Sequence, residues 1–324
     1  MDFWKAQRKA RRKTNLYLAV FIVLTLIVAG LVEYSMRWMA PHAYHPDIPT
    51  IGFMFLGVTF AVAGFQYWMY SKNGGSYVAE SVGARKVDPY TSDPHLRQLM
   101  NIVEEMALAA HLPMPAVYVM ESHQINAFAA GLSPDKAAIA ITYGTLEKLN
   151  RDEIQGVIAH EFGHIYNGDM KISLQLAAMV MGFYFILYFG LRALQISRFR
   201  GGGRSAGGGR GGNIIVLTAM LMIVAGIFTW FFGSILKSMV SRQREYLADA
   251  CSVQFTRNPS GIANALRKIG KDHDRDMPPS GMAYSHMYLD DKTFMSGLFA
   301  THPPLKKRIE AIESREYIPP EWEI

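Results

Sequence analysis

Four long runs of apolar residues interrupt the polar parts of this 324-residue chain. They extend over Leu16 to Val32, Ile51 to Tyr70, Ile172 to Leu191 and Ile214 to Leu236. Each run has about 20 residues, which is the length that an α-helix needs to cross the hydrocarbon core of a membrane. Their spacing, two close together and then two more, predicts two transmembrane hairpins separated by polar segments.

The polar segments have the pattern of an α+β protein that is mostly helical. Helical spacing of apolar residues predicts helices at 94–111, 237–255 and 260–270. Short runs that are rich in β-branched residues predict strands at 116–120 and 137–142. Residues 71–76 are rich in glycine and serine, and we expect them to form a linker between the first hairpin and the polar domain.

These segments divide the chain into five parts. They are a basic arm (1–15), a transmembrane hairpin (16–70), a first polar half (71–171), a second hydrophobic hairpin (172–236) and a second polar half (237–324). The second hairpin contains a Gly/Arg-rich loop at 197–213. RGG-like segments can bind RNA, but the repeats here are few and join two apolar runs, so we interpret them as a flexible loop.

Composition also indicates a membrane protein. Half of the residues are hydrophobic and 19% are charged, whereas about a quarter are charged in a typical soluble domain. The net charge of +6 is concentrated in the arm and the Gly/Arg-rich loop, so we expect a membrane surface, and no nucleic acid, as its partner. A cleaved signal peptide is the alternative for the first run, but residues 33–38 offer no small-residue cleavage site, and we predict an uncleaved anchor.

The single cysteine limits the chemistry of the chain. With Cys251 alone, neither an intrachain disulfide nor a metal site built on cysteines can form. We expect Cys251 to be a small buried residue, with a nucleophilic role as the alternative. Any metal site must therefore use histidine, aspartate or glutamate side chains.

The segment NRDEIQGVIAHEFGHIYNGDM contains an H-E-x-x-H motif formed by His160, Glu161 and His164. Asn150 followed by Glu153 is a capping box, which predicts that a helix begins here. On a helix the two histidines share one face and can hold one Zn²⁺, with Glu161 as a base toward water. The alternative is an ordinary amphipathic helix, because a chain of this length contains the motif by chance in roughly one case in a hundred.

A four-coordinate zinc site with two histidines and a water needs one more protein ligand. The metzincin pattern fails because Tyr166 and Met170 stand where it requires glycine and a ligand. Asp169 is near in sequence but out of register with the two histidines, and we expect it to be a helix-end residue. Glu245 is followed four residues later by Asp249, so one carboxylate can bind zinc while the other accepts the ring N–H of a ligand histidine. The alternative is a charged surface helix.

Four segments together resemble one family. NAFAAG, HEFGHIYNGDM, REYLADA and THPPLKKRI occur in this order, with apolar hairpins around the first catalytic half. Over nearly the whole chain they are similar to the HtpX-type membrane metalloproteases, relatives of the CAAX prenyl endopeptidases in the thermolysin-like gluzincin group. The resemblance implies a zinc endopeptidase with a zincin catalytic domain at the membrane surface. It also implies a role in protein quality control, in which misfolded or damaged membrane proteins are degraded.

The resemblance also implies roles for individual residues. His160, His164 and Glu245 match the family's zinc ligands, Glu161 matches its catalytic base, and Asp249 would support a ligand histidine. The segment Asn126, Ala127 and Phe128 resembles the edge strand that pairs with the substrate backbone, with a plain turn as the alternative. His302 matches a C-terminal motif and could stabilise an oxyanion or cap a proline turn.

Polar residues beside the motif place the predicted site outside the bilayer. Arg151, Asp152, Glu153 and Asn167 flank it, and they are too polar for the middle of a membrane. If the helices continue into the apolar runs, the site lies roughly a dozen ångströms above the apolar core. The basic arm and an even number of spans predict a cytoplasmic catalytic domain on a cell (inner or plasma) membrane. The loop arginines would then lie on the far side, so incomplete crossing by the third and fourth runs stays open.

Three functions are therefore compatible with the sequence. The first is a membrane-bound zinc endopeptidase that acts on protein or peptide substrates at the lipid bilayer. The second is a membrane scaffold or regulatory protein with a catalytically inactive metal site. The third is an intramembrane-cleaving metalloprotease, which the polar residues around the motif disfavour.

Overall fold

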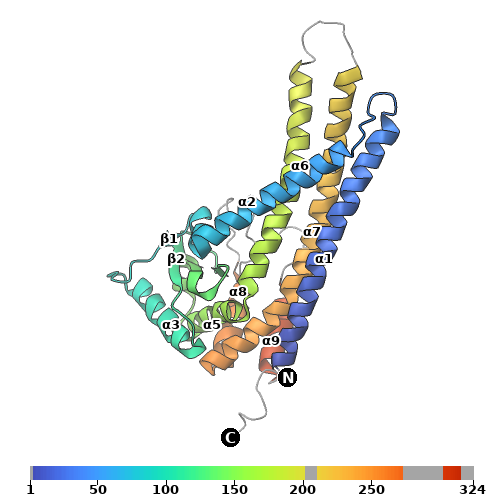
Figure 1. Cartoon of the computed structure of the whole chain (residues 1–324). Coiled ribbons are helices and arrows are strands. Elements are labelled where there is room, and N and C mark those ends of the chain that lie inside the picture. Colours follow the sequence, from blue (N-terminus) through green and yellow to red (C-terminus); the bar gives the residue numbers. More distant parts are fainter. Residues whose placement is uncertain (1–2, 201–209, 273–301, 315–324) are drawn as a thin grey trace. The chain divides into compact units, whose positions relative to one another are not determined.

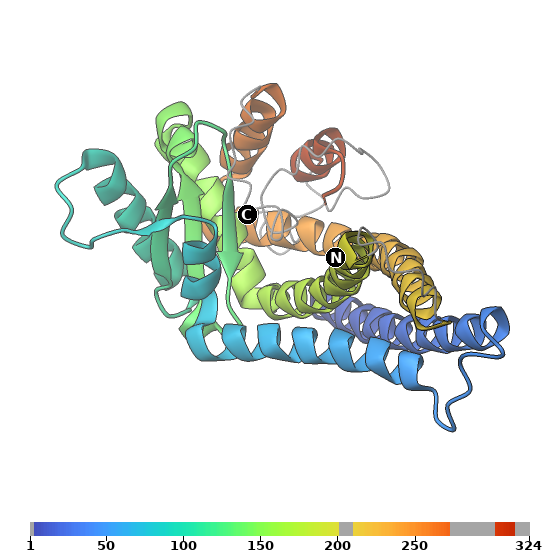
Figure 2. The same cartoon turned by 90° about the horizontal axis from the view of Figure 1, so that it is seen from above.

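A computed structural model describes residues 3–200, 210–272 and 302–314. Over these residues the chain is mostly helical with one small sheet, which confirms the expected fold class (Figures 1 and 2). It divides into two compact units. The membrane unit comprises 15–67 and 176–236, and the catalytic unit comprises 1–14, 68–175 and 237–324. Each unit is thus assembled from segments that are far apart in the sequence.

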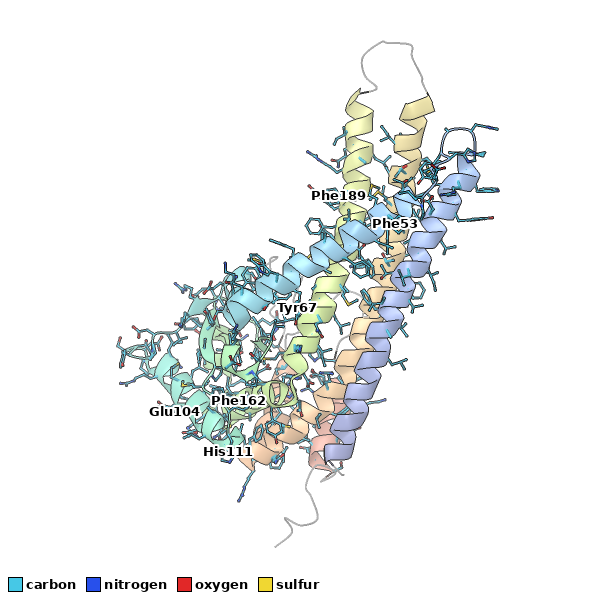
Figure 3. The ribbon with its side chains drawn as sticks, viewed as in Figure 1. Phe53, Tyr67, Glu104, His111, Phe162 and Phe189 are labelled. Atoms are coloured by element: carbon cyan, nitrogen blue, oxygen red, sulfur yellow. The ribbon has the colours of Figure 1, made fainter. Side chains whose placement is uncertain are left out.

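Four long helices carry the apolar runs: α1 (Phe3–Met39), α2 (Thr50–Ser81), α6 (Asp169–Arg200) and α7 (Arg210–Thr256). Within them, four segments are long and apolar enough to cross a membrane: Ala19–Met39, Thr50–Ser81, Asp169–Ile196 and Ile215–Gly233. Many of their apolar side chains are exposed, among them Phe53 and Phe189 (Figure 3). Lipid tails can cover such a surface, whereas water cannot do so without a large free-energy cost.

A buried carboxylate connects the first two helices of the membrane unit. Glu33 of α1 accepts hydrogen bonds from Arg37 and from the Tyr44 hydroxyl. It also accepts from the backbone N–H groups of Ile51 and Gly52 in the first turn of α2. The first N–H groups of a helix have no partner within the helix, so Glu33 caps α2 and holds the turn between the helices.

The sheet of the catalytic unit has four strands, β1 (Arg85–Lys86), β2 (Ala116–Met120), β3 (Ala127–Ala130) and β4 (Ala138–Thr142). Their order is β1-β2-β4-β3, with β2 and β4 parallel and the other pairs antiparallel. One face packs against α3 (Pro94–Ala110) and α5 (Arg151–Asn167). The other face meets the end of α2, where the Tyr118 hydroxyl donates to Glu80. Because both faces are covered, β2, β3 and β4 are almost entirely buried.

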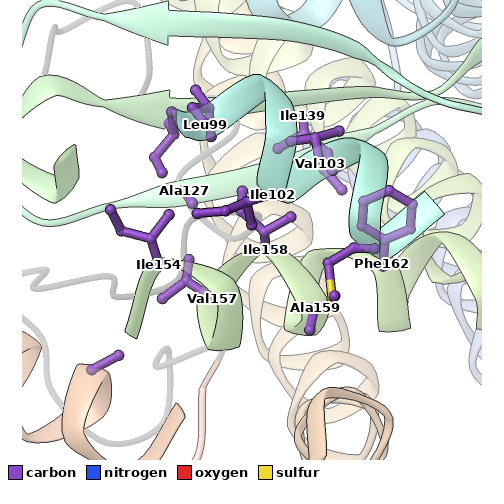
Figure 4. Close-up of a cluster of buried hydrophobic side chains, with 14 of the residues drawn as sticks. Leu99, Ile102, Val103, Ala127, Ile139, Ile154, Val157, Ile158, Ala159 and Phe162 are labelled. Atoms are coloured by element: carbon purple, nitrogen blue, oxygen red, sulfur yellow. The ribbon is translucent and has the colours of Figure 1, made fainter. Parts of the chain in front are cut away.

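The main hydrophobic core lies between the sheet and the helices of the catalytic unit. Figure 4 shows part of it, with Leu99, Ile102 and Val103 of α3 near Ile154, Ile158 and Phe162 of α5. On α5, α8 (Pro259–Lys271) packs so closely that a Cβ at Gly156 would lie 2.5 Å from the Ile262 nitrogen. α9 (Leu305–Glu313) buries Ile312 in the same core. A 3-10 turn, Pro134–Lys136, and α4 (Tyr143–Lys148) complete the described elements.

The linker expected at 71–76 is wrong, and the ends of the loop expected at 197–213 belong to helices. Residues 71–76 do not form a linker, because α2 continues to Ser81 with one kink at Gly74, where φ is 64°. Gly75 beyond it meets the sheet so closely that a Cβ would lie 2.1 Å from the Ala130 carbonyl oxygen. In the expected loop at 197–213, residues 197–200 end α6 and 210–213 begin α7, while 201–209 lie outside the described residues.

Candidate metal centre

The H-E-x-x-H segment lies on α5, as its capping signal predicts. The Asn150 side chain accepts a hydrogen bond from the Glu153 N–H at 2.9 Å, and the Asn150 N–H donates to the Glu153 carboxylate at 2.8 Å. These two bonds satisfy N–H groups that the helix itself leaves unpaired. One turn apart on this helix, the rings of His160 and His164 have centroids separated by 4.8 Å. α5 therefore presents both imidazoles to one side. Glu161, which follows His160 in the sequence, is also buried.

Helix α7 brings Glu245 to the two histidines. Its carboxylate oxygens lie 3.7 Å from His160 Nε2 and 3.5 Å from His164 Nε2. One potential ligand atom from each of the three residues lies within 4.8 Å of the others. α7 can approach α5 this closely because the motif has a glycine at its fourth position, where a Cβ on Gly163 would lie 3.0 Å from the Ala248 Cα.

The donor set fits a divalent metal ion. His160 Nε2 and Glu161 Oε2 are buried and have no hydrogen-bond partner among the described residues, an arrangement that is costly unless another group satisfies them. Two imidazoles and a carboxylate are the ligands that catalytic zinc sites use. The balance of buried charges at the site also favours a bound cation. The four carboxylates of Glu161, Asp169, Glu245 and Asp249, when ionised, exceed the positive charge of Arg244 and Arg308 by two.

Each histidine has a carboxylate on its other ring nitrogen. His160 Nδ1 lies 2.9 Å from Asp249, which occupies the position that its spacing from Glu245 predicts. His164 Nδ1 lies 3.3 Å from Asp169. Asp169 is the first residue of α6, as expected of a helix-end residue, and Gly168 before it has φ at 70°. Its contact with His164 is an additional role that the sequence did not predict. Carboxylates that accept Nδ1–H leave both Nε2 atoms available as ligands.

Two further side chains lie against Glu245. His302 Nδ1 is 2.7 Å from a Glu245 carboxylate oxygen, so the structure brings the predicted C-terminal histidine to the site. Arg308 of α9 is 3.1 Å from the same oxygen and also binds Asp249. Sequence reasoning missed Arg308. In the sequence, Arg308 is the third of three consecutive basic residues in THPPLKKRI, and nothing there separates it from Lys306 and Lys307. In the structure those two lysines are exposed and Arg308 is buried.

Burial and neighbouring charges shift the protonation of the site. Burial raises the pKa of the Glu161 carboxyl, although His164 and His160 oppose this effect. Burial alone would raise the pKa of Asp249, but Arg308 outweighs it and holds that pKa below its ordinary value. Burial would lower the pKa of His164, yet its hydrogen bond with Asp169 and the charge of Glu245 raise it to about 9. Without a cation, His164 therefore holds a proton that a metal ion must displace.

Among the described residues, the predicted substrate strand lies at an edge of the sheet. β3 begins at Ala127 and pairs with β4 on one side. The side chains of Asn126 and Phe128 are fully buried, so only the backbone of this segment can meet another chain. The Asn126 N–H donates to the hydroxyls of Thr142 and Thr145, and these bonds fix the start of the strand.

Comparisons of the sequence with a family model and with curated proteins agree on the family. Residues 95–316, which contain every side chain of the site, match the family model Peptidase family M48. A Protease HtpX homolog of Caldanaerobacter subterraneus is 34% identical over 96% of this chain and 97% of its own length. A second one, from Streptococcus pyogenes, is 40% identical over 66% of this chain and 72% of its own. A crystal structure of S. mikatae Ste24p is 18% identical with a TM-score of 0.44, covering 89% of this chain and 66% of that one.

Proposed function

The chain belongs to peptidase family M48 and is a membrane-bound metalloprotease, and from this premise we propose that His160, His164 and Glu245 bind one Zn²⁺ for peptide-bond hydrolysis. One observation carries the proposal. Two imidazole nitrogens and a carboxylate meet within 4.8 Å, although Glu245 lies 81 and 85 residues beyond the two histidines in sequence. A structural ion pair would not require both histidines to have carboxylates on their other ring nitrogens, whereas metal ligands are commonly held in this way.

The residues of the site have separate tasks in this mechanism. When bound, zinc supplies Lewis acidity toward a water molecule and toward the scissile carbonyl group. Asp249 and Asp169 hold the ligand histidines in one tautomer. Glu161 takes a proton from the attacking water and passes it to the leaving amine, a role that its raised pKa suits. No covalent intermediate with the protein is needed, which agrees with the burial of Cys251.

Two neighbouring features would act on the substrate. His302, next to Glu245, would stabilise the negative oxygen that develops as water attacks the carbonyl carbon. The backbone edge of β3, including Ala127 and Phe128, would pair with the substrate as an added strand. Such pairing recognises an extended backbone rather than a particular sequence, which suits an enzyme that removes misfolded proteins.

The apolar helices and the charge distribution support a proposal for the substrates and the location of the enzyme. We propose membrane proteins that are damaged or misfolded as its substrates, because four apolar helices tether the catalytic unit to a bilayer. The basic arm favours a cytoplasmic N-terminus at the inner or plasma membrane. With four crossings, the catalytic unit lies on the same side as the arm.

The deciding experiment compares three full-length proteins in detergent. Wild type is expected to contain about one zinc per chain and to cleave casein. Glu161→Gln should retain the metal and lose cleavage, while Glu245→Ala should lose both. Equal cleavage by wild type and Glu161→Gln would refute the mechanism. Function without cleavage in Glu161→Gln would instead favour the scaffold alternative.

A further inference from the structure

Both metal-binding histidines are held by the same kind of three-residue chain. His160 faces Asp249, and Asp249 accepts two hydrogen bonds from Arg308, at 2.9 and 2.7 Å. His164 faces Asp169, and Asp169 forms an ion pair with Arg244. A guanidinium group with several N–H donors holds a carboxylate in one orientation better than a single ammonium group does.

Arg308 differs from Arg244 in one respect: it also reaches a metal ligand directly. Its Nη1 atom lies 3.1 Å from the Glu245 carboxylate, while Nε and Nη2 bind Asp249. The side chain has no exposed surface at all. One planar group thus connects the third ligand, Glu245, with the carboxylate that orients the first ligand, His160.

Helix α9 carries Arg308 to the site from the C-terminal part of the chain. Ile312 is buried in the main core, and Leu305 packs on Gly270 of α8. At the surface, Glu313 forms an ion pair with Arg267 of α8, and both side chains are about half exposed. Arg308 and Arg267 therefore both join α9 to the rest of the catalytic unit, but only Arg308 touches the site.

We propose that Arg308 is a positioning residue that fixes the orientation of Glu245 and, through Asp249, of His160, and thereby couples the docking of α9 to metal binding. The proposal rests on the proposed function, since it assumes that these residues are the metal ligands. With the guanidinium in place, two like-charged carboxylates can lie side by side in a buried site before a cation arrives. Without it, they would repel each other and move apart.

Co²⁺ is the probe for this proposal, because its visible absorption bands report coordination geometry while chelator competition reports affinity. The full-length variants Arg308→Met and Arg308→Lys are compared with wild type, and Arg267→Met is the matched control on the same helix contact. Arg308→Met is expected to bind Co²⁺ 10- to 100-fold more weakly, the range for partners that orient metal ligands, and to show altered bands. Arg308→Lys should also bind more weakly, because an ammonium cannot replace the planar group. Arg267→Met should match wild type in both measurements.

Hydrogen exchange of residues 305–313 tests the coupling itself. Because linkage is reciprocal, Co²⁺ should protect α9 in wild type and Arg267→Met, and much less in the Arg308 variants. Unchanged affinity and spectrum in Arg308→Met, or no metal-dependent protection of α9 in wild type, would overturn the inference alone. If Arg308→Met does not fold, wild-type affinity and spectrum in Arg308→Lys overturn it. A wild-type protein that binds no Co²⁺ would overturn the proposed function as well.

Discussion

At the scale of single residues, the site is a set of buried charges, most of which have a defined partner. Asp249 has Arg308, and Asp169 has Arg244. Glu161 is different, because one of its buried oxygens has no hydrogen-bond partner among the described residues and burial raises its pKa. A carboxylate that must accept and release a proton benefits from this freedom, whereas a carboxylate that only orients a ligand benefits from being held.

Asp169 gives the first prediction at this scale. Asp169→Asn removes the negative charge that faces His164 Nδ1 and that pairs with Arg244. We expect metal affinity to fall 10- to 100-fold, measured by competition with a chelator. Asp152→Asn is the control, since Asp152 is an exposed aspartate on α5, the helix that carries His164. Equal affinity in the two variants would show that Asp169 does not orient His164.

The second prediction at this scale concerns the reactivity of Cys251. The thiol is fully buried and burial raises its pKa to about 12, so the reactive thiolate is almost absent at pH 8. We expect a thiol reagent to label the folded protein very slowly and the denatured protein at once, as followed by absorbance. Thiolate content increases only as pH rises toward 12, so folded protein should stay unreactive throughout neutral pH. Rapid labelling of the native protein would contradict the burial of Cys251.

At the scale of elements, the site depends on how closely α7 approaches α5. The two helices touch at Gly163, where a Cβ would lie 3.0 Å from the Ala248 Cα and 3.1 Å from its carbonyl oxygen. These neighbours are backbone atoms of a helix, so they cannot rotate away as a flexible side chain can. The glycine between the two halves of the motif therefore determines how far Glu245 lies from the histidines.

Gly163→Ala tests this dependence. Overpacking of this kind costs roughly 1–3 kcal/mol of stability, and it should move Glu245 away from the histidines and weaken metal binding. Thermal unfolding and chelator competition measure the two effects. Gly64→Ala on α2 is the control, because nothing lies within 4 Å of a Cβ there and alanine favours a helix by about 1 kcal/mol. Gly163→Ala with wild-type stability and metal affinity would show that α7 moves freely.

At the scale of the whole molecule, one site is shared by distant parts of the chain. The catalytic unit combines 68–175 with 237–324, and most of the membrane unit's second hairpin lies between them in sequence. α5 supplies the histidines, α7 supplies Glu245 and α9 supplies Arg308. A metal ion that binds only where these helices meet stabilises the folded state, so the metal-free protein should be the less stable form.

Metal removal tests this expectation. A ligand that binds only the folded state stabilises it by about 2.7 kcal/mol when present at 100 times its Kd. A chelator should therefore lower the Tm of the wild-type protein in detergent, and added Zn²⁺ should restore it. In Glu245→Ala, which lacks a ligand, Zn²⁺ should have little effect. A wild-type Tm that does not respond to chelation would argue against a metal ion bound at these residues.

The local parts of this protein could be predicted from sequence because the interactions that form them lie close together in the chain. Asn150 and Glu153 cap α5 within one turn, and the spacing of His160 and His164 places them on one face. The apolar runs likewise predict four membrane-spanning helices from length and composition. The linker expected at 71–76 failed because glycine can kink a helix as well as end it, and packing of Gly75 against Ala130 favours the kink.

Sequence by itself therefore determined most of the helices, the motif and, through the spacing of Glu245 and Asp249, the third candidate ligand. Only the tertiary structure decided which charged residues support the site. Nothing in the local sequence separates the buried Arg308 from Lys306 and Lys307 beside it, because its burial depends on how α9 docks. Asp169 needed the turn at Gly168 and the position of Arg244. Periodicity and capping are short-range properties, whereas a buried ion-pair network exists only after distant helices have packed.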